Sequence, residues 1–279
     1  MPHGTQTSRH LRSFQGAVCA CALLLWAAGA LASPIACGDQ PIRLAFYEYG
    51  YFYYSDKPGP AGIDKDIVEE LARRSGCRFS TQVLARARIW AELANGGLDM
   101  SVSGIQTPER DRFAWFAHYL SMKNYAVLGP SVPPAVQSAH DFLQHSKLQF
   151  GAVRAFRHGT RQDQWLDQLR ADNRVQDSAN VETLFKKLKE GRIDALFSQP
   201  AVYGKSLADL GLQHSTRIQD WTADEKGVPH GLILAKSRFS ADDAKAWQAL
   251  VATLRADGTL RRIYARYLSA AEASALLDF

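Results

Sequence analysis

The amino-acid sequence predicts an α/β fold made of two similar lobes, each with a parallel-rich sheet. Two observations support this class. Segments with strand character alternate with segments of helical periodicity, which is typical of parallel sheets covered by helices. In addition, residues 88–104 (RIWAELANGGLDMSVSG) align without a gap with residues 183–199 (TLFKKLKEGRIDALFSQ), at an offset of 95. We therefore expect the two halves of the chain to repeat one plan.

Residues 1–32 predict a cleaved secretory signal peptide and hence an exported protein. Residues 17–32 (AVCACALLLWAAGALA) form an apolar run too short to span a bilayer comfortably, and it ends in an A-x-A cleavage signal before Ser33. Cleavage leaves 247 residues with 31 basic and 28 acidic side chains, a net charge of +3. Because no run of five basic residues occurs, a nucleic-acid partner has little support.

The first half after the signal predicts three strands and two helices. The strands are expected at 41–46, 77–84 and 98–103, and the helices at 64–76 and 87–95. The first helix has acids in its first turn, arginines in its last turn and a glycine stop. A third helix is expected to begin at Thr107-Pro108-Glu109-Arg110, because threonine suits the N-cap and proline the first helical position.

The second half predicts the same kinds of element. Strands are expected at 150–153 and 193–198, helices at 160–171 and 181–190, and a mostly helical segment from Ser240 to the end. The stretch GPSVPP, residues 129–134, is the expected boundary between the lobes because it is rich in turn residues.

Two cysteines, Cys37 and Cys77, remain after signal cleavage. Two thiols in an oxidising compartment pair more often than they stay free, so we predict a disulfide, with two buried free thiols as the alternative. The eight histidines show no metal-ligand spacing, and we find no phosphate-binding loop or nucleophile motif. We therefore expect no metal and no cofactor.

Small polar residues at equivalent strand ends are the first candidates for ligand binding. Ligands of parallel sheets bind beyond the carboxyl ends of the strands, and the internal match puts Ser103-Gly104 and Ser198-Gln199 at equivalent ends. Arg110 follows the first of these ends. It either pairs with a surface acid such as Asp111 or clamps a ligand carboxylate with its planar fork.

Other candidates have two interpretations each. The aromatic run at 46–54 cannot all be core, so some of its side chains are expected to line a pocket, and Glu48 among them is either solvated or a partner for a ligand cation. Arg86 is either a surface charge or a site residue. The stretch RAFRHGTR, residues 154–161, has the composition of an anion site, in which His158 is either a ligand contact or solvent-facing.

Four motifs in this order resemble the periplasmic solute-binding proteins of polar-amino-acid ABC importers, the bacterial extracellular solute-binding protein family 3. They are YFYYSDKPGPAGIDKDIVEELARRSG, LDMSVSGIQTPER, EGRIDALFSQ and LRADGTLRRIYARYL. The resemblance implies a two-lobed periplasmic-binding-protein fold of type II, with two hinge crossings and a cleft that closes on ligand. It implies a first lobe at 33–127, a second lobe at 128–227, and a return to the first lobe at 228–279.

The resemblance also assigns roles to single residues. Arg110 matches the arginine that holds the ligand's α-carboxylate, and Ser103 and Gly104 match the small residues beside it. Phe52 matches a packing aromatic and Tyr49 an aromatic that stacks over ligand in some members.

The sequence departs from the family pattern at three places. The stretch between Gly104 and Arg110 is one residue shorter, Arg86 stands where many members have a stacking aromatic, and Gln199 replaces the aspartate that usually receives the ligand's ammonium. With Arg86, Arg110, Arg154 and Arg157 all expected near one cleft, these departures predict an acidic solute.

The expected function is that of a non-enzymatic receptor for a small carboxylate-bearing solute, an amino acid or related organic acid, which it hands to an inner-membrane ABC permease. An alternative is a cyclohexadienyl-dehydratase-like enzyme, in which Glu48 would donate a proton to a leaving hydroxyl. A sensor module is a third interpretation.

Overall fold

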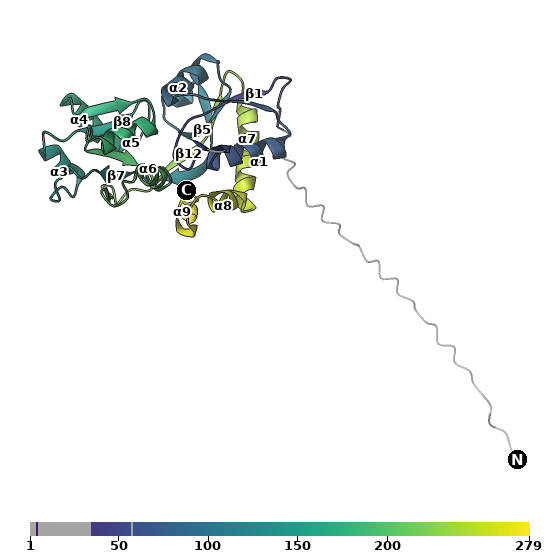
Figure 1. Cartoon of the computed structure of the whole chain (residues 1–279). Helices are drawn as coiled ribbons and strands as arrows, with labels where there is room; N and C mark the ends of the chain where they lie inside the picture. Colours follow the sequence, from purple (N-terminus) through teal and green to yellow (C-terminus); the bar gives the residue numbers. More distant parts are fainter. Residues whose placement is uncertain (1–3, 5–34, 57) are drawn as a thin grey trace. The chain divides into compact units, whose positions relative to one another are not determined.

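The computed structural model of the chain describes residue 4 and residues 35–56 and 58–279 (Figure 1). The predicted signal peptide, residues 1–32, therefore lies outside the described residues apart from Gly4. In the part of the chain that is described, no helix is long and apolar enough to cross a membrane.

The first sheet has the strand order β4-β1-β5-β12-β6. Strand β1 is parallel to both β4 and β5, while β12 runs antiparallel between β5 and β6. The bounds of these strands are β1 Ile42–Phe46, β4 Phe79–Val83, β5 Met100–Ile105, β6 Ala114–Met122 and β12 Val228–Ala235. We call this sheet and the helices packed on it the first lobe.

The second sheet repeats this order. Read from its other edge it is β9-β8-β10-β7-β11, with β8 parallel to β9 and β10 and with β7 antiparallel to β10 and β11. The bounds are β7 Tyr125–Leu128, β8 Phe150–Val153, β9 Val175–Ser178, β10 Ala195–Ser198 and β11 Arg217–Gln219. This sheet with its helices is the second lobe, and the predicted α/β fold with two similar sheets is confirmed.

The internal repeat has a structural basis in two aspartates. The side chain of Asp99 accepts a 2.8 Å hydrogen bond from the backbone N–H of Arg43, and its carbonyl accepts one of 2.9 Å from Ala235. At the equivalent position, Asp194 accepts from the N–H of Gln149 at 2.7 Å and its carbonyl from Gly129 at 2.7 Å. Each aspartate thus fixes its strand against both neighbours at the point where the strand begins.

Helices of the first lobe are α1 Ile63–Ser75, α2 Arg86–Asn95, α7 Ala241–Ala256, α8 Thr259–Tyr264 and α9 Ala270–Ala275. Helices of the second lobe are α3 Ala139–Gln144, α4 Thr160–Ala171, α5 Val181–Lys189 and α6 Pro200–Leu210. Helix α7 packs on β6 and α8 on α1, so the C-terminal segment belongs to the first lobe. A short hairpin, β2 Tyr54–Asp56 with β3 Gly59–Ala61, precedes α1.

The helix expected from Thr107-Pro108 does not form, and this prediction is wrong. Only a three-residue 3-10 turn, Arg110–Arg112, follows, with the hydroxyl of Thr107 accepting a 3.3 Å hydrogen bond from the N–H of Arg110. The reason is non-local: β6 begins at Ala114 and pairs along its length with β12, more than 100 residues later in the chain.

The chain crosses between the sheets twice. The first crossing lies between Met122, at the end of β6, and Tyr125, at the start of β7. The predicted limit of the first lobe at residue 127 therefore lies inside β7, and the stretch 129–134 follows β7 within the second lobe. The second crossing lies between β11 and β12, at residues 220–227.

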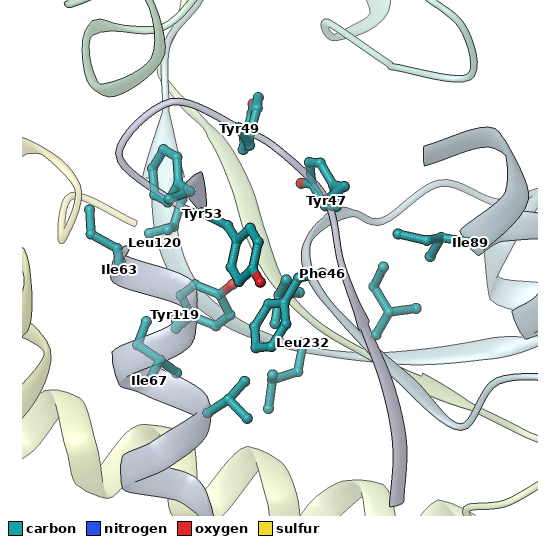
Figure 2. Close-up of a cluster of buried hydrophobic side chains, with 14 of the residues drawn as sticks. Phe46, Tyr47, Tyr49, Tyr53, Ile63, Ile67, Ile89, Tyr119, Leu120 and Leu232 are labelled. Atoms are coloured by element: carbon teal, nitrogen blue, oxygen red, sulfur yellow. The ribbon is translucent and has the colours of Figure 1, made fainter. Parts of the chain in front are cut away.

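The larger buried cluster joins the first sheet to its helices and extends into the second lobe, where it includes Leu184 of α5 and Val202 of α6. Figure 2 shows Phe46 from β1, Ile63 and Ile67 from α1 and Tyr119 from β6 meeting in this cluster. A disulfide joins Cys37 to Cys77 beside it, with an S–S distance of 2.04 Å. It ties the segment before β1 to the residue that follows α1 and its glycine stop.

Candidate functional site

Arg110 lies at the centre of the candidate site and contacts both lobes. Its Nη1 donates a 2.8 Å hydrogen bond to the carbonyl of Ile105 at the end of β5, and its Nη2 donates one of 2.9 Å to the carbonyl of Ala155, after β8. The guanidinium carbon lies 3.7 Å from the centroid of the Trp90 ring, a stacking cation–π contact. The short turn after β5 thus directs the side chain inward.

The charge of Arg110 is poorly compensated. The side chain is only 7% exposed, and no acid of the described chain lies within ion-pair distance of it. Burial, followed by the positive charges of Arg86 and Arg157, lowers the pKa of Arg110 to about 9. The alternative in which Arg110 pairs with Asp111 is wrong, since the Asp111 carboxylate accepts from Gln106 instead.

Arg86 is buried in an aromatic enclosure. Its guanidinium carbon lies 3.9 Å from the ring centroid of Tyr47, 4.6 Å from that of Phe156 and 5.0 Å from that of Tyr49. The residue is 5% exposed, and its Nη2 has no hydrogen-bond partner among the described residues. The surface-charge interpretation of Arg86 is therefore wrong, and the positive charge lies between the lobes.

Ser103 is held from three directions. Its φ angle is +47°, in the left-handed region, and its N–H donates to Tyr119 Oη at 2.7 Å. Its Oγ donates to Asp64 Oδ1 at 2.9 Å, and its carbonyl accepts from the Tyr47 hydroxyl at 3.2 Å. This network fixes the backbone at the strand end that the sequence marked as ligand-binding.

Gly104 has a packing reason to be glycine. A β-carbon there would lie 2.3 Å from Cγ1 of Ile233 on β12, closer than real contacts allow. Phe52 likewise acts as a packing residue, fully buried with its ring 5.3 Å from that of Tyr49.

Asp64 was missed as a site residue by the sequence analysis. We interpreted it as a first-turn acid of α1, but its carboxyl is fully buried below Ser103 and also accepts a 2.6 Å hydrogen bond from Tyr119. Burial raises the pKa of Asp64 to about 7, although both hydrogen bonds and Arg86 oppose the shift. The sequence indicated Asp64 only through its position after Ile63 in the motif YFYYSDKPGPAGIDKDIVEELARRSG, one of the four on which the family resemblance rests.

A chain of hydrogen bonds links the lobes at Gln199. The Tyr49 hydroxyl donates to Gln199 Oε1 at 3.0 Å, and Gln199 Nε2 donates to Asn124 Oδ1. Asn124 lies in the first crossing, and its Nδ2 donates to the carbonyl of His158 at 2.8 Å. Gln199 is also the N-cap residue of α6. Tyr49 and Gln199 are therefore brought together, while Asn124 had no signal in the sequence.

The stretch after β8 divides into buried and exposed residues. His158 is buried, 3.4 Å from Asp163 Oδ1, and burial lowers its pKa, so the solvent-facing interpretation is wrong. Arg154 and Arg157 are exposed, and Arg157 lies 3.5 Å from Glu109. Of the four arginines expected in one cleft, only Arg86 and Arg110 are buried there.

Two cavities open between the lobes, one beside Arg86 and one beside Tyr49, and neither is lined by Arg110. One of about 160 Å³ is bordered by Arg86 and by the start of α5, and one of about 290 Å³ lies between the β2–β3 hairpin region and helices α5 and α6. Glu48 is partly buried and lines both. In the residues that the structure describes, no three His, Cys, Asp or Glu side chains come together as a metal site.

Comparison with known proteins identifies a family. The model of the bacterial extracellular solute-binding proteins, family 3, matches residues 43–270. No curated protein matches the sequence.

Three solved structures illustrate the likeness in fold. An ancestral arginine-binding protein bound to arginine has 19% identity and a TM-score of 0.69, covering 82% of this chain and 98% of its own. The arginine-, lysine- and histidine-binding protein of Geobacillus stearothermophilus has 18% identity and a TM-score of 0.68, covering 82% and 95%. An ancestral amino-acid-binding protein, a precursor of cyclohexadienyl dehydratase, has 20% identity and a TM-score of 0.66, covering 82% and 96%.

Proposed function

We propose that this chain, which belongs to the bacterial extracellular solute-binding proteins, family 3, captures a small carboxylate-bearing solute between its lobes for ABC-type import. The solute is an amino acid or a related organic acid, and the chain acts in the periplasm as a receptor rather than as an enzyme. The observation that carries this proposal is the pair of buried guanidinium groups, Arg86 and Arg110.

Two buried cations with a single buried acid near them favour an anionic ligand. Taking a charge out of water costs several kcal/mol per ion unless a partner of opposite charge is supplied. The buried acid near Arg86 is Asp64, whose raised pKa of about 7 makes it a weak source of negative charge in neutral or acidic solution. A ligand carboxylate would supply the missing charge.

Arg110 retains the capacity to bind such a carboxylate. A guanidinium has five N–H donors, and two of the nitrogens of Arg110 each make one hydrogen bond to a main-chain carbonyl. Because those carbonyls belong to different lobes, a carboxylate at Arg110 would contact the residue that joins them. Ligand binding and lobe movement would then be coupled through one side chain.

Hinge motion at the two crossings would open the cleft. Contacts between the lobes include the Arg110–Ala155 and Tyr49–Gln199 hydrogen bonds, a 2.9 Å hydrogen bond from the N–H of Tyr51 to the carbonyl of Ala201, and apolar packing in the larger buried cluster. These contacts would break for a solute to enter, and closure around it would present the permease with a distinct loaded form.

An enzyme of the cyclohexadienyl-dehydratase kind is a second candidate. The observation that favours it is Glu48, an acid that shares the 160 Å³ cavity with Arg86. Loss of prephenate during incubation, followed spectroscopically, would support the enzyme, and unchanged prephenate would support the receptor.

A thermal-shift screen tests the proposed function. A ligand that binds only the folded protein raises its melting temperature by mass action. We expect carboxylates and carboxylate-bearing amino acids to raise it, while their amides and methyl esters have smaller effects. A rise produced by cationic solutes without a carboxylate, such as argininamide, and by none of the carboxylates would contradict the proposal.

A further inference from the structure

We propose that the 160 Å³ cavity beside Arg86 receives a second anionic group of the solute, so that the protein selects dianions over monoanions. This inference rests on the proposed function and deepens it, because Arg110 would hold the first carboxylate and Arg86 the second anionic group. Arg86 is therefore assigned as the residue that determines specificity for ligand charge.

The cavity lies where equivalent elements of the two lobes meet. Its walls are the end of β4 with the start of α2, and the end of β8 with the start of α5. Helices α2 and α5 are the two members of the internal repeat at an offset of 95 residues. A small group in the cavity would therefore contact both lobes at once, which is the position from which a ligand stabilises closure.

The start of α2 is suited to an anion. Its N-cap is Ala85, no side chain caps its first N–H groups, and its first turn contains no acid. The first N–H groups of a helix lack partners within the helix and carry a partial positive charge, which favours anions. Arg86 at the first helical position adds a full positive charge to the same place.

Arg86 also has a buried side-chain nitrogen, Nη2, without a hydrogen-bond partner among the described residues. The residue borders the cavity and is only 5% exposed. A cation at a helix N-terminus opposes the helix dipole, and an unmade hydrogen bond on a buried charged group is costly. A ligand anion in the cavity would place an opposite charge beside this guanidinium and offset its unfavourable interaction with the helix dipole.

Glu48 also lines this cavity, so the direction in which its neutralisation changes affinity reveals the charge of the bound group. A carboxylate in the wall repels a ligand anion. If the cavity holds an anionic group, neutralising Glu48 strengthens binding of dianions. If the cavity instead holds a ligand ammonium, neutralising Glu48 weakens binding.

The experiment measures affinity for matched solutes that differ by one charge. Calorimetry compares succinate with succinamate, glutarate with glutaramate, and L-glutamate with L-glutamine. For the wild type we expect the acid of at least one pair to bind tighter than its amide by about tenfold or more. In Arg86→Met, which keeps apolar packing against Tyr47, this ratio should fall to about one, with the affinity for the amide changed less than about threefold.

Three further variants complete the design. Arg88→Gln removes the same charge from the same helix, but at an exposed side chain 3.3 Å from Glu92, and should keep the wild-type ratio. Arg86→Lys retains a cation, should preserve part of the preference, and serves as the test if Arg86→Met fails to fold. Glu48→Gln should raise the ratio.

The outcomes separate this inference from the proposed function. Equal binding of acid and amide by the wild type, an unchanged ratio in Arg86→Met, or weaker dianion binding in Glu48→Gln would each overturn the second subsite while leaving the carboxylate receptor intact. Failure of every carboxylate to bind would overturn both.

Discussion

The hydroxyl of Ser103 donates a 2.9 Å hydrogen bond to Asp64 Oδ1, which joins the end of β5 to the first turn of α1. Tyr119 on β6 donates to the same oxygen at 2.6 Å, while the other oxygen, Oδ2, is buried and has no partner in the described chain. A single buried carboxyl thus holds the strand end on which the candidate site is built, and the free energy of folding should depend on its protonation.

Asp64→Asn should make stability less sensitive to pH. Because the pKa of Asp64 is raised to about 7 on folding, the folded state binds a proton that the unfolded state releases near pH 4. The wild type therefore loses unfolding free energy as pH rises from about 4 to about 7, by up to about 4 kcal/mol at about 1.4 kcal/mol per pH unit. In urea denaturation, the unfolding free energy of the variant relative to that of the wild type should be larger at pH 8 than at pH 5. A constant difference between the two would contradict this.

Removing the disulfide should destabilise the first lobe. Cys37 and Cys77 are 40 residues apart, and in the chain-entropy account a loop of that length contributes about 2–4 kcal/mol. The double variant Cys37→Ser, Cys77→Ser should melt at a lower temperature, and the wild type should expose no alkylatable thiol until a reductant is added. Two reactive thiols in the unreduced, denatured wild type would show that the bond does not form.

Gln199→Asp should shift preference toward solutes with a free ammonium group. A carboxylate at this buried position would attract a ligand ammonium, and a unit-charge contact at about 4 Å is worth roughly 4 kcal/mol before desolvation. The affinity for L-glutamate relative to glutarate should therefore rise by tenfold or more, on the order of 1.4 kcal/mol. Gln199→Glu, which keeps the side-chain length, serves as the comparison, and an unchanged glutamate-to-glutarate ratio in both variants argues against an ammonium site at this position.

Local sequence patterns predicted the elements that local chemistry determines. Helix α4 has the predicted bounds, and α1 differs by one residue at each end, because capping residues and hydrophobic periodicity are properties of the segment itself. The repeated aspartates, Asp99 and Asp194, also signalled two similar sheets before their hydrogen bonds were known.

Features that depend on distant contacts could not be predicted in this way. The stretch after Thr107 has good helix-start residues, but pairing of β6 with β12 overrides them. The burial of Asp64 depends on Ser103 and Tyr119, which are 39 and 55 residues away. Phe156 reaches Arg86 from the other lobe, so neither its role nor the exposure of Arg154 follows from the composition of its own segment.

Calorimetry on Arg110→Gln tests most directly whether the buried arginine charge between the lobes binds a carboxylate. The titrant is the carboxylate that raises the melting temperature of the wild type most, and the control is Arg112→Gln, which removes an exposed arginine from the same turn. We predict a loss of about 2–5 kcal/mol in binding free energy for Arg110→Gln, since the ligand charge is left unpaired, and little change for Arg112→Gln. A loss smaller than tenfold in affinity, below about 1.4 kcal/mol, or an equal loss in both variants, would contradict the account.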